Sequence, residues 1–393
     1  TEIYTLSLHD ALPIFAHPPA APFAATVSSA RTSEGGLAAL GRWLDGTGYA
    51  DLFSSFHPAS FSPGRFIELA PILDDGLRAL VRLLYLGEPL TPAELAGLPS
   101  LVPDALGDAG LLDTDPAGNV HLHGLMLLPV LNHWLFFERP HVMMTLYYGD
   151  DSFALLNRLR VRAGMRALDL CCGPGIQTLQ LAAAGAEVTS VDINPVALHL
   201  AGRNLAVNGI PAGRVRLTQA DLTARWPVEG RFDLIVANPP LLPVPSGTFY
   251  PLVGDGGDDG LRITRQILHA LPGALAPGGR FQTLGTTFSD GAAPMFTDEV
   301  AAWAAANGMS ATVVVTHHNP FQPGTPMFDM LTTTAQRCLG QDRETVRGQY
   351  DRLRTGFGQM HLCSYYLTVC NDPAPGFQYI DLSEPGQDGL WFR

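Results

Sequence analysis

Short apolar segments alternate with longer amphipathic segments from Met165 onward, and this alternation constrains the fold more than any other feature of the sequence. Strands and helices in strict alternation are typical of a parallel sheet that is covered by helices on both faces. We expect helices over residues 175–184, 195–208 and 260–276. The predicted fold class is α/β, with a seven-stranded Rossmann-like sheet whose strands lie at 166–171, 187–192, 215–218, 232–237, 280–284, 311–316 and 364–370.

The region before this sheet predicts a separate, mainly helical domain over residues 31–145. Apolar residues recur at helical spacing over 36–49 and 75–86. A capping box at Thr91–Glu94, a short helix near 103–109 and a strand at 118–123 follow. This order resembles a winged helix, which either binds DNA or serves in packing or dimerisation. Residues 31–150 hold 6 arginines and 14 acidic groups, a net charge of −8 that disfavours DNA.

Two segments fall outside these patterns. Residues 1–30 are expected to be disordered or artefactual, because Thr1–Ile14 resembles the translation of a sequencing adaptor and a Pro- and Ala-rich stretch follows. Within the second predicted domain, 146–393, residues 317–362 are too long to be a hairpin connection. We interpret them as a cap inserted over the site, with one helix at 343–354, and expect the tail after residue 370 to pack back on the domain.

The charged residues exclude several chemistries. All 24 basic residues are arginines, so catalysis through a lysine Schiff base and a P-loop lysine are both excluded. The net charge of −13 opposes binding to nucleic acid. The five cysteines are odd in number and show no metal-ligand spacing, which favours a reducing compartment and no metal. Since the most apolar stretch, 124–137, is too short to span a bilayer, we expect a cytoplasmic protein without membrane contact.

Glycine or aspartate residues at the ends of three successive predicted strands predict a nucleotide-like ligand. Gly173 and Gly175 lie in the turn after the first strand, where glycine allows the backbone to approach a ligand closely. Asp192 ends the second strand, where a carboxylate can accept both hydroxyls of a ribose. Asp221 follows the third strand and can accept an adenine amine. Taken singly, the glycines could form an ordinary turn and the aspartates could cap helices.

The sequence LDLCCGPG at 168–175 resembles the nucleotide motif of class I S-adenosylmethionine-dependent methyltransferases, and the resemblance extends over about 147–284. This resemblance implies the seven-stranded Rossmann-like sheet described above and S-adenosylmethionine as the cofactor. It departs from the family at Cys171, where glycine is usual. In this resemblance, the stretch 147–151 takes the place of the loop that contacts the methionine end of the cofactor; a packed linker between the two domains is the alternative. The implied cofactor-binding residues are Tyr148, Asp169, Cys171, Gly173, Gly175, Asp192, Asp221, Leu222 and Asn238.

A second motif, NPPL at 238–241, follows the fourth strand. The two prolines hold the backbone so that the Asn238 amide oxygen and the Pro239 carbonyl can face outward together. Two fixed acceptors can bind the hydrogens of an acceptor nitrogen and aim its lone pair. The motif resembles the NPPY of amide and amine methyltransferases, and 254–261 resembles the GG-x-DGL segment of release-factor glutamine methyltransferases. The catalytic residues implied are Asn238, Pro239 and Pro240.

The acceptor is less constrained. Leu241 replaces an aromatic residue that normally stacks on a planar acceptor, which weakens the case for a nucleobase or a glutamine amide. The predicted substrate-binding residues are Leu241, Phe249, Tyr250, His317 and His318. We therefore expect N-methylation of a small-molecule or natural-product acceptor. Methylation of a protein amide, O- or C-methylation, another transfer from the same cofactor and a ligand-sensing DNA-binding protein remain alternatives, and a homodimer is an open option.

Overall fold

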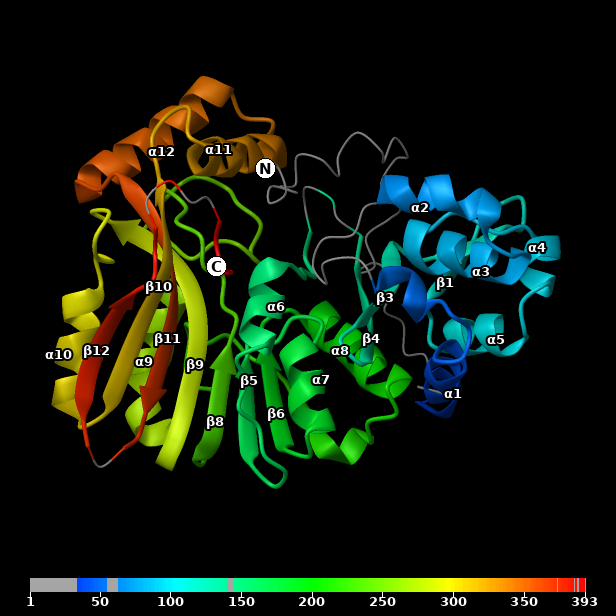
Figure 1. The fold of residues 1–393 in the computed structure, drawn as a ribbon, viewed down its shortest axis with the longest axis horizontal. Coiled ribbons are helices and arrows are strands. Elements are labelled where there is room, and N and C mark those ends of the chain that lie inside the picture. The colour runs from blue at the N-terminus through cyan, green and yellow to red at the C-terminus, as the bar shows by residue number, and fades with distance from the viewer. Residues whose placement is uncertain are drawn as a thin grey trace.

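The computed structural model describes residues 34–54, 63–139, 141, 144–372, 374–384, 386 and 389–392, so the expectation for residues 1–30 lies outside the described part. Its centre is an eight-stranded sheet in the order β12-β10-β11-β9-β8-β5-β6-β7 (Figure 1). The strands are β5 (Arg166–Leu170), β6 (Glu187–Asp192), β7 (Val215–Gln219), β8 (Phe232–Ala237), β9 (Leu275–Ser289), β10 (Ser310–Pro320), β11 (His361–Cys370) and β12 (Gly376–Asp381).

The seven expected strands are all present, and the α/β fold is confirmed. The strands β5 to β9 run parallel to one another, whereas β11 is antiparallel to both β9 and β10. The count of seven was too low, because the tail adds β12 in parallel to β10. The alternating sequence GFQYID suits such an edge strand, with one row of side chains more exposed than the other.

Helices cover both faces of the sheet, as the alternation predicts. On one face lie α6 (Asp150–Leu156), α7 (Ile176–Ala183) and α8 (Pro195–Val207), which share a hydrophobic cluster with β5, β6 and β8. On the other lie α9 (Arg262–Ala274) and α10 (Thr297–Asn307). Local chemistry fixes where the helices begin: the side chain of Asn194 accepts the Val196 N–H at 2.9 Å and caps α8.

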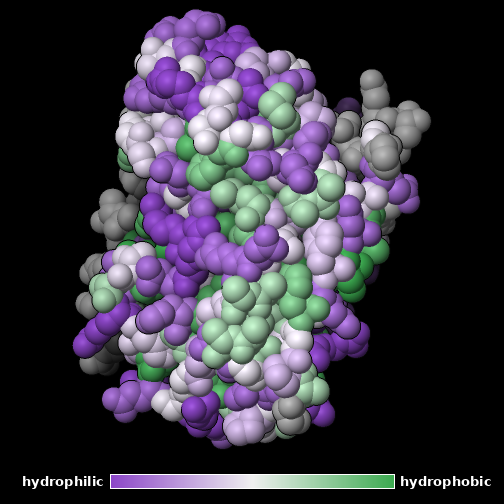
Figure 2. Space-filling model, turned by 90° about the vertical axis from the view of Figure 1, so that its left-hand side faces the viewer, coloured by the Kyte–Doolittle hydropathy of each residue, from purple (hydrophilic) through white to green (hydrophobic). Residues whose placement is uncertain are grey.

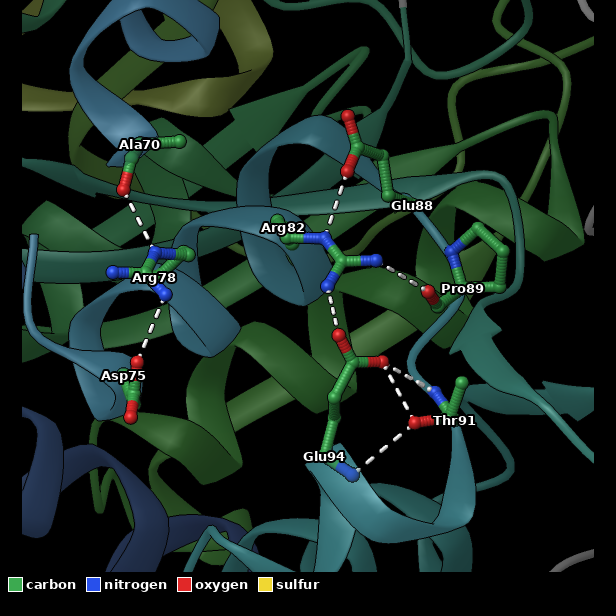
Figure 3. Close-up of polar contacts among 8 residues, drawn as sticks. All are labelled: Ala70, Asp75, Arg78, Arg82, Glu88, Pro89, Thr91 and Glu94. Atoms are coloured by element: carbon green, nitrogen blue, oxygen red, sulfur yellow. Dashed lines mark hydrogen bonds and ion pairs between the residues drawn. The ribbon is translucent and has the colours of Figure 1, made fainter. Parts of the chain in front are cut away.

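The N-terminal region contains the expected helices, the hairpin and the capping box, in which Thr91 and Glu94 bond reciprocally. A second hairpin, β3–β4, was not predicted. Figure 3 shows Arg82 between Glu88 and Glu94, and these contacts tie η4, which contains Arg82, to α4, which contains Glu94. The elements are α1 (Glu34–Leu44), η2 (Ala50–Phe53), α2 (Pro63–Leu69), η3 (Ala70–Ile72), α3 (Asp75–Leu80), η4 (Val81–Leu86), α4 (Pro92–Ala96), α5 (Leu101–Asp108), β1 (Leu112–Thr114), β2 (Val120–Leu122), β3 (Leu125–Val130) and β4 (His133–Glu138).

This region is fastened to the sheet through α8. The Asn204 side chain accepts the Phe136 N–H at 2.7 Å and donates to the Phe136 carbonyl at 2.9 Å, so it replaces a strand partner for β4. Asn204 also donates to the Pro174 carbonyl at 2.8 Å, in the turn that follows β5. Helix α1 packs so closely on α8 that a Cβ on Gly41 would lie 2.0 Å from the Val207 carbonyl oxygen. One hydrophobic cluster therefore spans both regions.

Between β10 and β11 lie two helices, α11 (Pro326–Leu339) and α12 (Arg343–Phe357), of which the sequence predicted only the second. They project beyond the sheet at the end where β10 finishes (Figure 1). Phe321 and Phe328 are fully buried in a cluster with Phe288 and Tyr350. His317 and His318, expected to open the cap, are part of β10, which continues through a bulge to Pro320. The inserted segment is thus shorter than predicted.

Figure 2 looks onto the β12 edge of the sheet. Hydrophilic surface dominates its upper part, over α11 and α12, and hydrophobic patches are interspersed below. Helix α12 has the charged sequence RETVRGQYDRLRTGF, in keeping with this hydrophilic surface. Among the described residues, no helix combines the length and apolar composition that crossing a lipid bilayer requires.

Candidate active site

A cavity of about 500 Å³ lies where the parallel strands β5, β6 and β8 end. In α/β sheets, ligands bind in the crevice at the carboxyl ends of the strands. The turn after β5, the ends of β6 and β8, the segment after β7, and the starts of α6 and α9 all contribute to its wall. The lining residues used below are Tyr147, Asp151, Ser152, Cys171, Gly173, Asp192, Asp221, Leu222, Asn238, Pro239, Pro240, Leu252, Val253 and Arg262.

The turn after β5 has the geometry that its glycines predict. Gly173 and Gly175 have φ of +53° and +85°, in the left-handed region that favours glycine. A Cβ on Gly175 would lie 2.9 Å from the Ala201 Cβ, so glycine is also needed for α7 to approach α8. Cys171, which stands where the resembled family has glycine, adopts φ of +56°. The turn thus keeps a glycine-like conformation at a residue for which it costs roughly 1–2 kcal/mol.

Asp192 lies at the end of β6 on the cavity wall, as predicted. Its Oδ2 accepts the Gly173 N–H and its Oδ1 accepts the Asn194 N–H, both at 2.8 Å. Burial raises the pKa of Asp192, and the backbone donors act against that rise. A carboxylate fixed by two backbone bonds still has free lone pairs for hydroxyl donors of a ligand.

Asp221 and Leu222 line the same cavity after β7. The Thr223 hydroxyl and N–H donate to Asp221 Oδ1 at 2.7 and 2.8 Å, which lowers the pKa of Asp221. Asp221 therefore presents an ionised carboxylate at neutral pH. The Asp221 side chain accepts the hydrogen bonds that form a local turn, and the residue also lines the cavity.

Asp169 lies behind the wall and does not line the cavity. It is 1% exposed, and its Oδ2 accepts the Thr178 hydroxyl at 2.5 Å. Its Oδ1 is buried without a hydrogen-bond partner in the described part of the chain. Burial raises the pKa of Asp169 to about 7. Asp169 is placed to support the turn after β5 rather than to touch a ligand.

The NPPL motif supplies the most informative side chain. Asn238, Pro239 and Pro240 all line the cavity. The Asn238 Nδ2 donates to Ser152 Oγ at 3.2 Å and to Asp151 Oδ2 at 3.3 Å. Its Oδ1 is buried, and within the described residues it has no hydrogen-bond partner. Because buried acceptors are rarely left unsatisfied, this oxygen is suited to a donor from a ligand.

The stretch 147–151 reaches the site, but through different side chains from the one predicted. Tyr147 and Asp151 line the cavity, whereas Tyr148 does not. Tyr148 packs against Phe137, with ring centroids 5.2 Å apart, in the N-terminal hydrophobic cluster. The sequence around Tyr147 and Tyr148 does not show which of the two adjacent side chains points into the cavity. The GDDS sequence at 149–152, which begins α6, was the available signal for Asp151.

None of the five predicted substrate-binding residues lines the cavity. Leu241 and Tyr250 are buried in hydrophobic clusters, and Phe249 is 46% exposed. His317 Nδ1 lies 3.2 Å from the Leu390 carbonyl oxygen, and His318 Nδ1 lies 2.7 Å from Ser289 Oγ. Of the nine predicted cofactor-binding residues, six line the cavity: Cys171, Gly173, Asp192, Asp221, Leu222 and Asn238. Gly175, like Tyr148 and Asp169, does not line it, and the five predicted substrate-binding residues lie elsewhere.

The segment after NPPL folds back on itself, which explains the displacement. The Leu242 N–H donates to the Gly254 carbonyl, and the Gly256 N–H donates to the Leu242 carbonyl, both at 2.9 Å. A Cβ on Gly260 would lie 2.4 Å from the Thr286 carbonyl oxygen, so the GDGGDDGL sequence lets the segment close against β9. Leu252, Val253 and Arg262 reach the cavity instead.

No group of three His, Cys, Asp or Glu placed to bind a metal ion occurs among the described residues.

Comparison with known proteins agrees with this geometry. The methyltransferase small domain family matches residues 148–295. A protein assigned as an N5-glutamine methyltransferase in Methanocaldococcus jannaschii is 33% identical over 35% of this chain and 69% of its own length. The ribosomal protein uL3 glutamine methyltransferase of Bradyrhizobium diazoefficiens is 38% identical over 34% of this chain and 44% of its length.

A third relative acts on a small molecule. It is the 4-amino-L-phenylalanine/4-methylamino-L-phenylalanine methyltransferase of Streptomyces pristinaespiralis, 33% identical over 33% of this chain. The chain spans 47% of that relative, and 44% of the uL3 enzyme, so in both cases the similarity covers less than half of the relative. All three relatives are named as methyltransferases, two of them for a protein glutamine and the third for an amino acid.

Proposed function

Because the chain belongs to the class I S-adenosylmethionine-dependent methyltransferases, we propose that it transfers the methyl group of this cofactor to a nitrogen atom of a small-molecule acceptor. The observation that carries the proposal is the Asn238 amide: the residue lines the cavity, and its Oδ1 is a buried acceptor without a partner in the described chain. A nitrogen that bears hydrogens would supply the missing donor.

The cavity fits the cofactor. S-adenosylmethionine supplies a methyl group bonded to a positively charged sulfur. Three carboxylates, Asp151, Asp192 and Asp221, line the cavity and suit a cationic ligand. We assign Asp192 to the ribose hydroxyls, and Asp221 with Leu222 to the adenine. The turn at Gly173–Gly175 allows the ligand to lie close to the backbone.

The NPPL residues act on the acceptor. The Asn238 Oδ1 and the Pro239 carbonyl accept the hydrogens of the acceptor nitrogen and so direct its lone pair toward the methyl group. The nitrogen gains positive charge as it is methylated, and two fixed dipoles stabilise this charge without reorganisation. An acceptor nitrogen that binds in its neutral form already has a free lone pair, so no strong general base is needed to deprotonate it before methylation.

Two observations favour a small acceptor. Leu241 is 6% exposed in the core, so this position offers no ring on which a planar amide or base could stack. The Streptomyces relative methylates an arylamine of an amino acid. The second candidate is a protein glutamine amide, and the archaeal and Bradyrhizobium relatives favour it.

Methyl-labelled S-adenosylmethionine and two acceptor probes test the proposal: 4-amino-L-phenylalanine and purified ribosomal protein uL3. We expect label on the nitrogen of a small arylamine or amine, and its loss in Asn238→Ala. Label on uL3 alone would replace the small acceptor with a protein amide. Label found on oxygen or carbon by fragment mass spectrometry would overturn nitrogen transfer altogether.

A further inference from the structure

An amide side chain has two ends of nearly equal size, so the use of Asn238 depends on which end faces the cavity. Rotation of the amide by 180° would exchange Oδ1 and Nδ2 with little change in shape. With the nitrogen toward the cavity, the site would present a donor to an acceptor nitrogen that already carries hydrogens. Something in the protein must therefore select the orientation that presents the oxygen.

The neighbours of the Asn238 Nδ2 make that selection. Asp151 Oδ2 lies 3.3 Å and Ser152 Oγ 3.2 Å from it, and both belong to the first turn of α6. Burial raises the pKa of Asp151, while the hydrogen bonds from the Ser152 N–H, the Asn238 amide and the Tyr147 hydroxyl lower it and favour the ionised form. An ionised carboxylate can only accept hydrogen bonds, so the end of the amide that faces it has to be the NH₂ group. The reversed amide would place two acceptor oxygens, those of Asn238 and Asp151, against each other.

Asp151 is itself held in place. The Ser152 N–H donates to Asp151 Oδ1 at 2.7 Å, and the Tyr147 hydroxyl bonds to the same carboxylate. Asp151 is 8% exposed and Ser152 2% exposed. Gln177 of α7 donates to the Ser152 carbonyl at 3.2 Å, which anchors this turn to the sheet domain. The carboxylate is thus a fixed reference for the Asn238 amide.

We infer that Asp151, assisted by Ser152, is a positioning residue that orients the Asn238 amide so that its oxygen faces the acceptor nitrogen. This inference rests on the proposed nitrogen transfer for its catalytic meaning. The orientation itself can be measured without turnover. A hydrogen bond to a charged group biases the two orientations by about ten- to a hundredfold, which sets the size of the expected effect.

The first test is a double-mutant cycle on the catalytic rate in an acceptor assay, with Asp151→Leu, Asn238→Ala and the pair. We expect Asp151→Leu to lower kcat by about ten- to a hundredfold, and to cause little further loss when Asn238 is already alanine. Asp151→Asn, which retains an acceptor oxygen, should recover part of the rate. Asp150→Leu is the matched control: it removes a neighbouring, exposed carboxylate that does not line the cavity.

Equal losses in both backgrounds would overturn the inference, because Asp151 would then act independently of Asn238. A loss confined to cofactor affinity, measured by calorimetry, would overturn it as well. The second test needs no acceptor. The ¹⁵N side-chain amide signal of Asn238, identified by its absence in Asn238→Ala, should shift in Asp151→Leu but not in Asp150→Leu. An unmoved signal rejects the inference, whereas a moved signal with no N-methylation rejects only the proposed function.

Discussion

The polar contacts of Arg82 with Glu88, Pro89 and Glu94 in the N-terminal region, here called the Arg82 cluster, differ from those of the Asn238 site in whether every polar group has a partner. Arg82 donates to Glu88 at 2.9 Å, to the Pro89 carbonyl at 3.0 Å and to Glu94, which closes the capping box with Thr91 (Figure 3). At the site, the Asn238 Oδ1 is buried and has no partner within the described residues. The first region completes its polar contacts within the chain, and the second leaves one open.

This difference separates groups that stabilise the fold from groups that are kept for a ligand. A buried acceptor without a donor costs about 1–3 kcal/mol, and where its residue lines a cavity, as Asn238 does, a ligand can supply the donor. Changes at the site should therefore alter turnover and binding more than stability. Changes in the Arg82 cluster should do the reverse, and four substitutions test this contrast in order of decreasing effect.

The largest effect is expected at Asn238. Asn238→Ala removes one preorganised polar group, which by analogy lowers kcat by about 10²–10³. The free energy of unfolding should fall by only about 1 kcal/mol, because the lost oxygen had no partner in the described chain and only the Nδ2 bonds to Ser152 and Asp151, at 3.2 and 3.3 Å, are removed. Steady-state kinetics and urea unfolding measure the two quantities. Full activity in this variant would end the nitrogen-transfer proposal.

The next effect is expected at Asp192. Asp192→Ala should weaken S-adenosylmethionine binding by about ten- to a hundredfold, because hydrogen bonds to a charged group contribute about 1.5–3 kcal/mol. Titration calorimetry gives the dissociation constants. Asp221→Ala is the comparison, and a smaller loss is expected there because Asp221 is more exposed and solvent competes for its bonds. Unchanged binding in Asp192→Ala would reduce Asp192 to a structural acceptor.

Local patterns in the sequence predicted the parts of the molecule that depend on local chemistry. The sequence predicted the alternation of strands and helices, the glycine turn at Gly173–Gly175 and the Thr91 capping box, because each arises from residues a few positions apart. Asp192 could be placed because parallel strands end at one edge of the sheet. The family resemblance then supplied the cofactor.

The errors arose where distant segments decide the outcome. Leu241 and Tyr250 follow NPP in sequence, yet the pairing of Leu242 with Asp255 turns them into the core. Asp151 is 87 positions from Asn238, so no spacing rule joins them. The strand β12 depends on an unpaired edge of β10, and a sequence pattern does not show that such an edge is open.

Asp169 is a second residue with a buried acceptor atom that has no partner in the described chain, and its effect on stability should depend on pH. Burial raises its pKa to about 7 in the folded protein, against about 3.9 when unfolded. The folded state binds the extra proton between these values, so the contribution of Asp169 to stability is complete below pH 4 and is lost as pH rises through about 7. Relative to Asp169→Asn, the wild type should lose stability over this window, by at most about 1.4 kcal/mol per pH unit. Urea unfolding at several pH values measures the difference. A constant difference would contradict the raised pKa.

The smallest effect is expected in the region whose contacts are already complete. Arg82→Ala removes two ion pairs and one carbonyl bond, with the arginine side chain 26% exposed and its partners 42% and 39% exposed. Partly exposed pairs contribute about 0.2–1 kcal/mol each, so we expect the free energy of unfolding to fall by about 1 kcal/mol. Arg65→Ala is the matched control, because its pair with Glu68 is 62% and 66% exposed and should contribute almost nothing. Cofactor affinity and kcat should stay at the wild-type value in both variants, because neither arginine lines the cavity. A lower cofactor affinity in Arg82→Ala, with the free energy of unfolding unchanged, would contradict this contrast, because the Arg82 contacts would then affect the site. The Asn204 bonds to the Phe136 and Pro174 carbonyls, which connect the two regions, would be the contacts to mutate next.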